Sequence, residues 1–298
     1  MKNTKKTLLL LLVAMIWGTA FVAQSKGMDY VEPFTYCAMR MLLGGVMLIP
    51  VIMVLDTRRS DEERQRIRNN RKTQLLGGMF CGIVICISSM FQQFGVKYTT
   101  VGKASFITAL YIVIVPIISI FMKKHVSNLA AVSVVLAVAG FYLLCISKTS
   151  GIQSGDLLVL ICAVCFSMHI IIIDYFSPRV DGVRMACMQF LVCGVISLVG
   201  MVLFEHPSFE AIWNCRAAIG YSGIMSCGVA YTLQIIAQKD VNPTVASLLM
   251  SLESVFGAIA GYFILDETFT KRQFVGCVII FAAVILAQIP EKEKKERN

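Results

Sequence analysis

The side chain with the sharpest chemical meaning in this 298-residue chain is Glu253. It lies about ten residues inside a long apolar segment, where a bare carboxylate carries a high free-energy cost. It should therefore face protein or water. We expect either a proton-coupling or amine-recognition group, or a structural carboxyl that is hydrogen-bonded to a neighbouring helix.

A second group of reactive side chains lies in another apolar segment. Cys162 and Cys165 form a C-x-x-C pair on one helical face, and His169 follows one turn later. This spacing is compatible with a metal or redox site, but cysteine also serves as a small apolar packing residue. No second Cys/His cluster completes four ligands, so we expect no metal. His169 is either functional or a hydrogen-bonded packing residue.

The patterns of the common intramembrane and nucleotide-dependent enzymes are missing from the sequence. It contains no G-x-S-x-G, H-E-x-x-H or P-loop pattern. We therefore expect no catalytic residues, no enzymatic activity and no cofactor.

The elements that must position these side chains follow from composition. The chain is 57% hydrophobic and 15% charged, with a mean hydropathy of +0.75, well beyond a soluble domain. About 20 apolar residues cross a bilayer, and ten such segments are present, which predicts an all-α membrane protein with short loops. The segments are residues 7–24, 34–55, 73–94, 102–122, 129–146, 156–176, 183–204, 216–238, 243–265 and 273–289.

The chain also contains itself twice. A shift of 149 places residues 8–46 on the second half without gaps, and a shift of 142 does the same for residues 78–113, so that Gln92 meets Gln234. Each copy holds five spans, an odd number, so the second copy must insert upside down. We therefore predict ten transmembrane helices arranged as two inverted five-helix repeats. The predicted units are residues 1–148, residues 149–290 and a charged cytoplasmic tail at 291–298.

The basic residues predict the orientation. With the N-terminus inside, 19 of the 27 Lys and Arg residues fall on the cytoplasmic side and 7 on the other. Both termini are therefore expected in the cytoplasm, and the first apolar segment is expected to be a retained helix, not a signal peptide. The net charge of +9 then reports topology, so we expect membrane lipid as a partner and no nucleic acid.

Arg40 is a basic residue seven residues into the second predicted span. We expect it to pair with Asp29 or Glu32, or to snorkel outward. Gln189 takes its place in the second copy, so we favour an anchoring role.

Three stretches carry a family resemblance: AMIWGTAFVAQS, PFTYCAMRMLLGG and SLLMSLESVFGAIAGYFILDETFTKRQFVGCVII. Together with the duplicated ten-span layout, they resemble the EamA family of the drug/metabolite transporter superfamily. The family pattern often has Glu-Pro inside the ninth span and Gly-Glu at its end, where this chain has Glu253-Ser254 and Asp266-Glu267. The resemblance implies a central cavity lined mainly by spans one, three, four, six, eight and nine, with the other four spans peripheral.

Helical spacing and the repeat select the side chains that face this cavity. They form stripes on the implied lining spans, with aromatic rings and amides prevailing, which suits a small amphipathic metabolite. The predicted cavity residues are Trp17, Phe21, Gln24, Gln92, Thr108, Tyr111, Phe166, His169, Tyr231, Gln234 and Glu253.

The sequence therefore predicts a secondary transporter of the bacterial cytoplasmic membrane, working by alternating access. Amino acids or related amphipathic compounds are the expected cargo, and export is the expected direction. A non-transporting membrane receptor or assembly protein, and a passive solute channel, are the alternatives. A homodimer is a further possibility, and Glu253 is the candidate for proton coupling.

Overall fold

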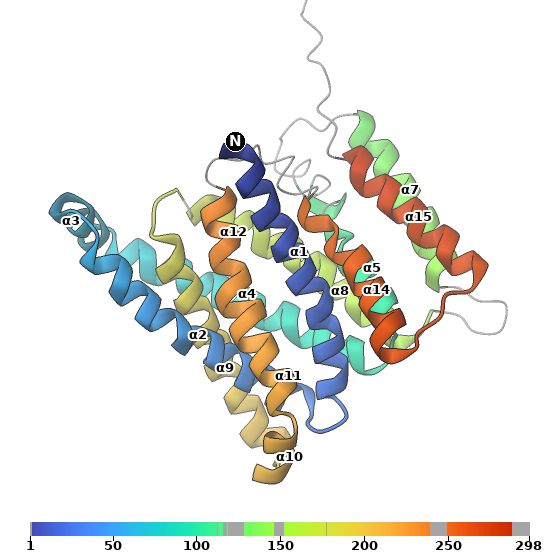
Figure 1. Ribbon diagram of the computed structural model, residues 1–298, viewed down its shortest axis with the longest axis horizontal. Coiled ribbons are helices and arrows are strands. Elements are labelled where there is room, and N and C mark those ends of the chain that lie inside the picture. Colours follow the sequence, from blue (N-terminus) through green and yellow to red (C-terminus); the bar gives the residue numbers. More distant parts are fainter. Residues whose placement is uncertain are drawn as a thin grey trace, which may run out of the picture.

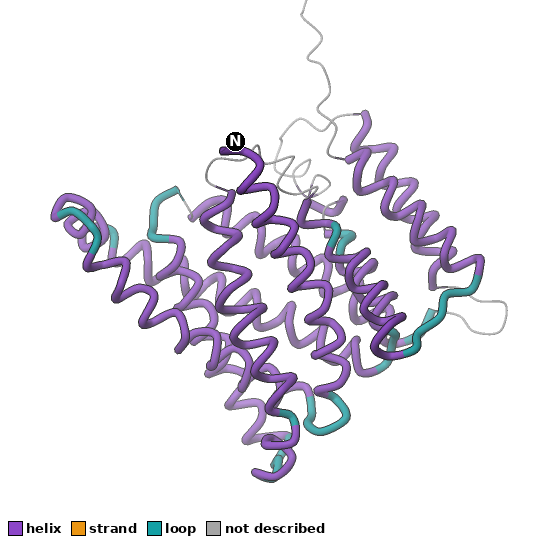
Figure 2. Tube along the Cα trace, in the orientation of Figure 1, coloured by secondary structure: helices purple, strands orange, loops and turns teal. Residues whose placement is uncertain are grey.

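A computed structural model describes residues 2–111, 113–115, 118, 128–145, 152–176, 178–238 and 249–287. Throughout these ranges the regular structure is helical, without strands (Figures 1 and 2). The elements are α1 (Lys2–Gly27), α2 (Pro33–Thr57), α3 (Asp61–Asn69), α4 (Arg71–Lys97), α5 (Val101–Thr108), α7 (Asn128–Cys145), α8 (Ser154–Phe176), α9 (Gly182–Phe204), α10 (Phe209–Asn214), α11 (Arg216–Gly220), the π-helix η1 (Tyr221–Ala230), α12 (Tyr231–Gln238), α14 (Glu253–Leu265) and α15 (Lys271–Ala287).

Five of these helices are long and apolar enough to cross a membrane. They coincide with predicted spans one, two, three, six and seven. Shorter apolar helices lie within spans four, five and nine, at Val101–Val115, Val132–Leu144 and Leu249–Leu265. The predicted cytoplasmic tail and the predicted loop near Lys123 lie outside the described residues.

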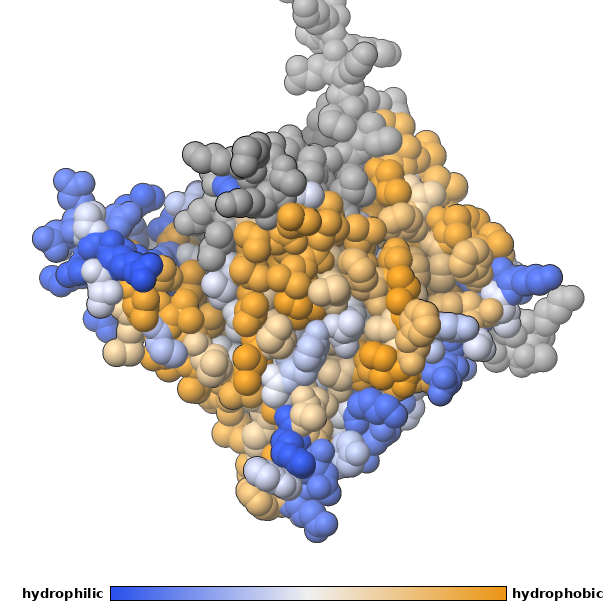
Figure 3. Space-filling model, viewed as in Figure 1, coloured by the Kyte–Doolittle hydropathy of each residue, from blue (hydrophilic) through white to orange (hydrophobic). Residues whose placement is uncertain are grey.

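The outer surface is that of a membrane protein. Large apolar side chains such as Met53, Val138 and Phe263 are more than half exposed. Figure 3 shows a broad apolar surface over the bundle, with hydrophilic residues gathered towards its ends, notably at α3. A continuous exposed apolar surface of this kind is stable against lipid chains and not against water.

The helices pack side by side, some pairs antiparallel, such as α2 with α9 and α4 with α8, and others parallel, such as α4 with α9 and α1 with α14. α2 packs along α9, α4 packs against α8 and α9, and α1 packs against α14 and η1. The helices α7 and α15 form a pair along one side of the bundle (Figure 1). Small residues allow the close contacts: a Cβ atom on Gly78 would lie 2.6 Å from the Cβ of Met188 in α9.

Two predicted spans are broken at corresponding places. In span four, α5 ends at Thr108, a turn occupies residues 109–110, and helical structure resumes at Tyr111. In span nine, a turn at Leu252 precedes α14, whose first residue is Glu253. The shift of 142 that aligns the repeats places residue 110 on residue 252. Hydropathy alone predicted continuous helices here.

Carboxylates from distant parts of the chain cap two helix N-termini. Glu205, just after α9, accepts hydrogen bonds from the backbone N–H groups of Phe34 and Thr35 at 2.8 and 2.6 Å. Glu267 accepts from the N–H groups of Val101 and Gly102 at 2.6 and 2.9 Å. Each carboxylate satisfies N–H groups that have no partner within their own helix.

Asp266 explains how Glu267 reaches α5. It adopts a left-handed conformation with φ 55° and ψ 27°, which turns the chain sharply at the end of α14. Glycine adopts this conformation without strain, and aspartate is one of the few other residues that tolerate it. This position is where the resemblance expects the glycine of a Gly-Glu pair, so the local geometry accommodates the substitution.

The Glu205 cap supports a testable prediction. Replacing Glu205 with alanine is expected to lower the stability of the fold by about 1–2 kcal/mol, because α2 loses the acceptor for its first N–H groups. Glu210, an exposed acid in the first turn of α10, provides the matched control. SDS-induced unfolding of the purified variants would measure the difference. Equal midpoints for the two alanine variants would contradict a capping role.

Candidate functional site

A central cavity of about 560 Å³ lies among the helices. It is lined from α1, α2, α4, α5, α8, η1 and α12, and by residues at and next to the two helix breaks. All eleven side chains that the sequence predicted for a cavity line this one. Their part in binding a substrate stays a prediction, but their convergence from segments far apart in sequence is a property of the fold.

The two helix breaks meet in the cavity. Tyr111 follows the break in span four, Glu253 follows the break in span nine, and the Tyr111 hydroxyl donates a hydrogen bond to Glu253 Oε1 at 3.0 Å. Glu253 is only 5% exposed. Its place in the first turn of α14 brings its carboxyl close to the positive end of the helix dipole, which favours negative charge.

Aromatic rings form one wall. The Trp17 and Tyr231 ring centroids are 5.0 Å apart, and Phe190 stands edge-on to Tyr231 at 5.1 Å. The Trp17 indole N–H also donates to the backbone carbonyl of Ser226 in the π-helix η1 at 3.3 Å. The wide turns of a π-helix depart from ordinary helical hydrogen bonding and often occur at functional sites. Phe21 and Phe166 add further apolar surface.

Amide and hydroxyl groups supply the polar contacts. Gln92 donates to the Thr108 hydroxyl at a long 3.5 Å. The side-chain Oε1 of Gln24 is buried without a hydrogen-bond partner in the described part of the chain. Gln234 lines both this cavity and a second one next to it. These groups provide hydrogen bonds that a ligand can accept or donate.

His169 lines the cavity and also contacts Gln189. Its Nε2 lies 3.0 Å from Oε1 of Gln189 in α9, so one ring nitrogen is already hydrogen-bonded. Cys162 is buried, and Cys165 is half-buried. Within the ranges that the structure describes, no group of three His, Cys, Asp or Glu side chains is placed to hold a metal ion.

Arg40 corrects the sequence prediction in two respects. It pairs with neither Asp29 nor Glu32, because Asp29 pairs with Lys26 at 3.9 Å and Glu32 with Lys97 at 2.6 Å. It does not snorkel outward either, since it is 4% exposed and lines the central cavity. Span two was expected to be peripheral, yet it supplies both Arg40 and Met41 to the lining. The sequence did carry a signal for this position, because residues 34–55 of the second span contain Arg40 but no Asp or Glu.

A second cavity of about 920 Å³ adjoins the first and shares Ile173, Tyr231 and Gln234 with it. It lies between the C-terminal end of α2, the N-terminal end of α4 and the segment that joins α8 to α9. Its lining includes Arg58, Arg66 and other basic side chains. The central cavity therefore continues towards one end of the bundle.

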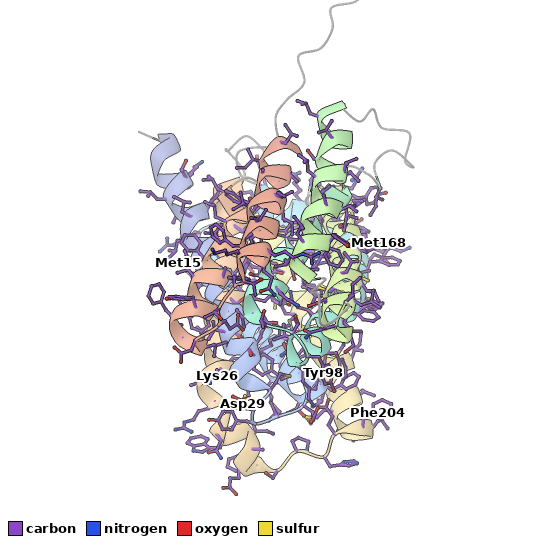
Figure 4. The ribbon with its side chains drawn as sticks, turned by 90° about the vertical axis from the view of Figure 1, so that its right-hand side faces the viewer. Met15, Lys26, Asp29, Tyr98, Met168 and Phe204 are labelled. Carbon is purple, nitrogen blue, oxygen red and sulfur yellow. The ribbon has the colours of Figure 1, made fainter. Side chains whose placement is uncertain are left out.

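The opposite end of the bundle is tied by charged contacts. Lys103 and Asp156 form an ion pair of 3.2 Å between the N-terminal ends of α5 and α8, and Lys97 pairs with Glu32. The Glu205 and Glu267 caps lie at this end too. Figure 4 shows the labelled Lys26, Asp29, Tyr98 and Phe204 gathered there, away from Met15 and Met168.

Known proteins resemble this chain over nearly its whole length. A transporter of Archaeoglobus fulgidus is 30% identical to the chain over 281 residues, which cover 94% of this chain and 84% of that protein. The transporter YoaV of Bacillus subtilis is 20% identical and covers 92% and 93%, and a chloroplastic WAT1-related protein of Arabidopsis thaliana is 24% identical and covers 92% and 67%. A crystal structure that is 18% identical shares the fold, with a TM-score of 0.66 over 96% of both chains.

A family model gives the same assignment in two parts. It matches residues 4–146 and 153–288, which together span nearly the whole chain. The match thus falls once on each predicted half. The chain is a multi-pass membrane protein that belongs to the EamA-like transporter family.

Proposed function

We propose that this protein is a secondary transporter that moves small metabolites across the bacterial cytoplasmic membrane by alternating access. The proposed unit has ten spans in two inverted five-helix repeats, with both termini in the cytoplasm. The observation that carries the proposal is the contact between Tyr111 and Glu253 in the central cavity. These two residues occupy equivalent positions in the two halves, and equivalent residues meet where an approximate twofold axis passes.

Reciprocal contacts between α2 and α9 support the same symmetry. A Cβ on Gly45 would lie 2.7 Å from Cδ2 of Leu191, and a Cβ on Gly194 would lie 2.7 Å from Cδ2 of Leu42. The shift of 149 makes Gly45 equivalent to Gly194 and Leu42 equivalent to Leu191. Each half therefore offers the same glycine to the same leucine of the other, as a twofold relation requires.

The broken helices support a binding site near the middle of the membrane. Inverted-repeat transporters commonly bind substrate where a pair of interrupted helices meets, at corresponding places in the two halves. Here the breaks at residues 109–110 and at Leu252 correspond, and both adjoin the cavity. Two similar halves around one site can exchange which side is open at little cost in free energy.

The cavity geometry supports an inward-open state. The second cavity lies at the end that carries Arg58, Arg66 and Arg179, and the distribution of basic residues predicts that this end faces the cytoplasm. The opposite end is held by the Lys103–Asp156 and Lys97–Glu32 pairs. Cargo would load from the cytoplasm in this state, which fits export. The aromatic and amide lining fits amino acids or related amphipathic compounds.

Flux through proteoliposomes tests the proposal. We expect saturable uptake or efflux of labelled amino acids or metabolites from a pooled set, driven by a pH gradient. Glu253→Gln is expected to abolish the gradient-driven component of the flux, because the amide of glutamine cannot take up and release a proton as the buried carboxyl can. Glu62→Gln changes an exposed acid of α3 and serves as the control.

The possible outcomes separate the parts of the proposal. Saturable flux that ignores both the gradient and Glu253→Gln would leave a facilitator, with Glu253 as a structural group. Flux that never saturates would indicate a channel. Absence of flux for every compound would contradict transport and favour a receptor or assembly role.

A further inference from the structure

Arg40 is a buried cation, and the described residues place no carboxylate beside it. In the described part of the chain, Nη2 of its guanidinium donates one hydrogen bond, to the sulfur of Cys37 at 3.6 Å, and its Nε has no partner. An arginine carries five N–H donors, and sulfur is a weak acceptor. No carboxylate of the described residues lies within 4.0 Å of Arg40, whereas those of Asp29 and Glu32 have other cations.

Such an arrangement is costly unless something else completes it. A buried charge without a partner destabilises a protein by several kcal/mol, and arginines within spans normally face an acid, backbone carbonyls or a water-filled cavity. Arg40 faces the central cavity. Tyr36 adds a cation–π contact, with its ring centroid 5.7 Å from the guanidinium carbon, but the Tyr36 hydroxyl is engaged with Ser222. The unused N–H donors of Arg40 are therefore available to a molecule that enters the cavity.

The second half supplies an internal comparison. Gln189 is equivalent to Arg40, and His169 is equivalent to Ala20. In the second half these two side chains hydrogen-bond to each other at 3.0 Å. In the first half the partner position holds Ala20, which also lines the cavity and has no polar atom in its side chain. The first half thus has a charged group where the second has a neutral one, and free space where the second has a partner.

The second cavity, which leads to the central one, also carries excess positive charge. The lining of the second cavity contains four arginines and only two acids, Glu63 and Asp181. Asp181 is paired with Arg59. A cleft lined with excess positive charge raises the local concentration of anions and speeds their entry.

We propose that Arg40 binds a carboxylate of the cargo, so that the central cavity selects small organic acids or amino acids over the corresponding amides and esters, which lack the carboxylate. The planar guanidinium can grip a carboxylate through two parallel hydrogen bonds, and these are stronger than hydrogen bonds between neutral groups. The aromatic wall around Trp17 and Phe166 would then receive the apolar part of the molecule. This inference rests on the proposed transport function for its biological meaning, but binding can be measured without transport.

Thermal stabilisation of the purified full-length protein in detergent tests the proposal. The probes are benzoate, phenylacetate, L-leucine and L-phenylalanine, each compared with its amide or methyl ester. We expect the acids to bind about 10- to 100-fold more tightly than the amides and esters, which lack the carboxylate, the range of a charge-assisted hydrogen bond. Arg40→Met is expected to remove this preference, and Arg40→Lys to restore part of it. Arg216→Met changes an exposed arginine at the other end and should preserve it.

A second variant tests the same idea while keeping Arg40. Ala20→Glu places a carboxylate at the position from which His169 contacts Gln189 in the other half. We expect this internal carboxylate to pair with Arg40, to raise the melting temperature and to weaken binding of the acids by a similar 10- to 100-fold. Ala20→Gln keeps the size without the charge and is expected to weaken binding less.

The outcomes distinguish this inference from the transport function. Equal binding of acids and amides by the wild-type protein would overturn the inference, even if transport is observed. The same holds if Arg40→Met folds and keeps the preference for acids, or if no acid stabilises the wild-type protein relative to chloride. A preference for acids that depends on Arg40, without flux in proteoliposomes, would support the binding site and contradict the transporter.

Discussion

Replacement of Asp156 with alanine is expected to lower the free energy of unfolding by about 3–5 kcal/mol, the range for breaking a buried ion pair by removing one partner. Asp156 is fully buried, and the Lys103 side chain is 8% exposed at a distance of 3.2 Å. The Thr99 hydroxyl donates to the other carboxylate oxygen at 2.5 Å. Alanine at this position leaves a buried ammonium group without a counter-charge and a hydroxyl without its acceptor.

The midpoint of SDS-induced unfolding would measure this effect. Asp29→Ala removes an ion pair near the same end of the bundle, but there both side chains are more than half exposed. Its expected cost is at most about 1 kcal/mol. The double variant Lys103→Met, Asp156→Leu removes both charges and should recover most of the loss. A cost for Asp156→Ala below that of Asp29→Ala would show that the pair contributes nothing.

Gly18→Leu is expected to have the second large effect, on the contact between α1 and α14. A Cβ on Gly18 would lie 2.6 Å from the Cβ of Phe256 and 2.7 Å from the backbone atoms Glu253 O and Gly257 N. Backbone cannot yield as a flexible side chain does, so the helices must separate. Alanine alone should cost about 1–3 kcal/mol, the usual range for overpacking, and leucine should cost more. Because α14 begins at Glu253, the separation should also displace the cavity carboxyl and abolish flux.

Gly220 is the matched control for Gly18. A Cβ on Gly220 would meet nothing within 4 Å, so Gly220→Ala should be neutral or slightly stabilising, since alanine favours helix over glycine. Unfolding midpoints and flux would be compared for Gly18→Ala, Gly18→Leu and Gly220→Ala. Similar losses at both glycines would mean that flexibility, and not the close approach of α1 and α14, is what these positions provide.

Much of the helical layout could be predicted from hydropathy, because lipid requires long apolar segments whose backbone groups bond within the helix. The five long helices lie where the sequence predicted spans. The break at Leu252, the π-helix η1 and the Glu205 cap were not predicted. Each of these features involves hydrogen bonds or packing between segments far apart in the chain, and the hydropathy of a local segment gives no information about such contacts.

The cavity side chains could be selected because two independent constraints agree. Helical spacing puts Ala104, Thr108 and Tyr111 on one stripe, and the repeat then points to Glu253 in the other half. Arg40 was assigned wrongly because acids close to it in sequence, Asp29 and Glu32, offered obvious partners. In the folded chain those acids lie near other cations, Lys26 and Lys97, and only the tertiary structure decides between the two pairings.

The pairing of His169 with Gln189, set against Ala20 and Arg40, has a consequence for energetics. In the proposed transport cycle, two identical halves would make the inward-open and outward-open states equivalent by twofold symmetry, and therefore equally populated. A cation in one half and a satisfied neutral amide in the other make those states chemically distinct. On the proposed alternating-access cycle, the empty protein would rest with unequal populations of the inward-open and outward-open states, and a bound anion would shift that balance by the difference in its affinity for the two states. Divergence between the two copies thus gives the empty protein a preferred resting state.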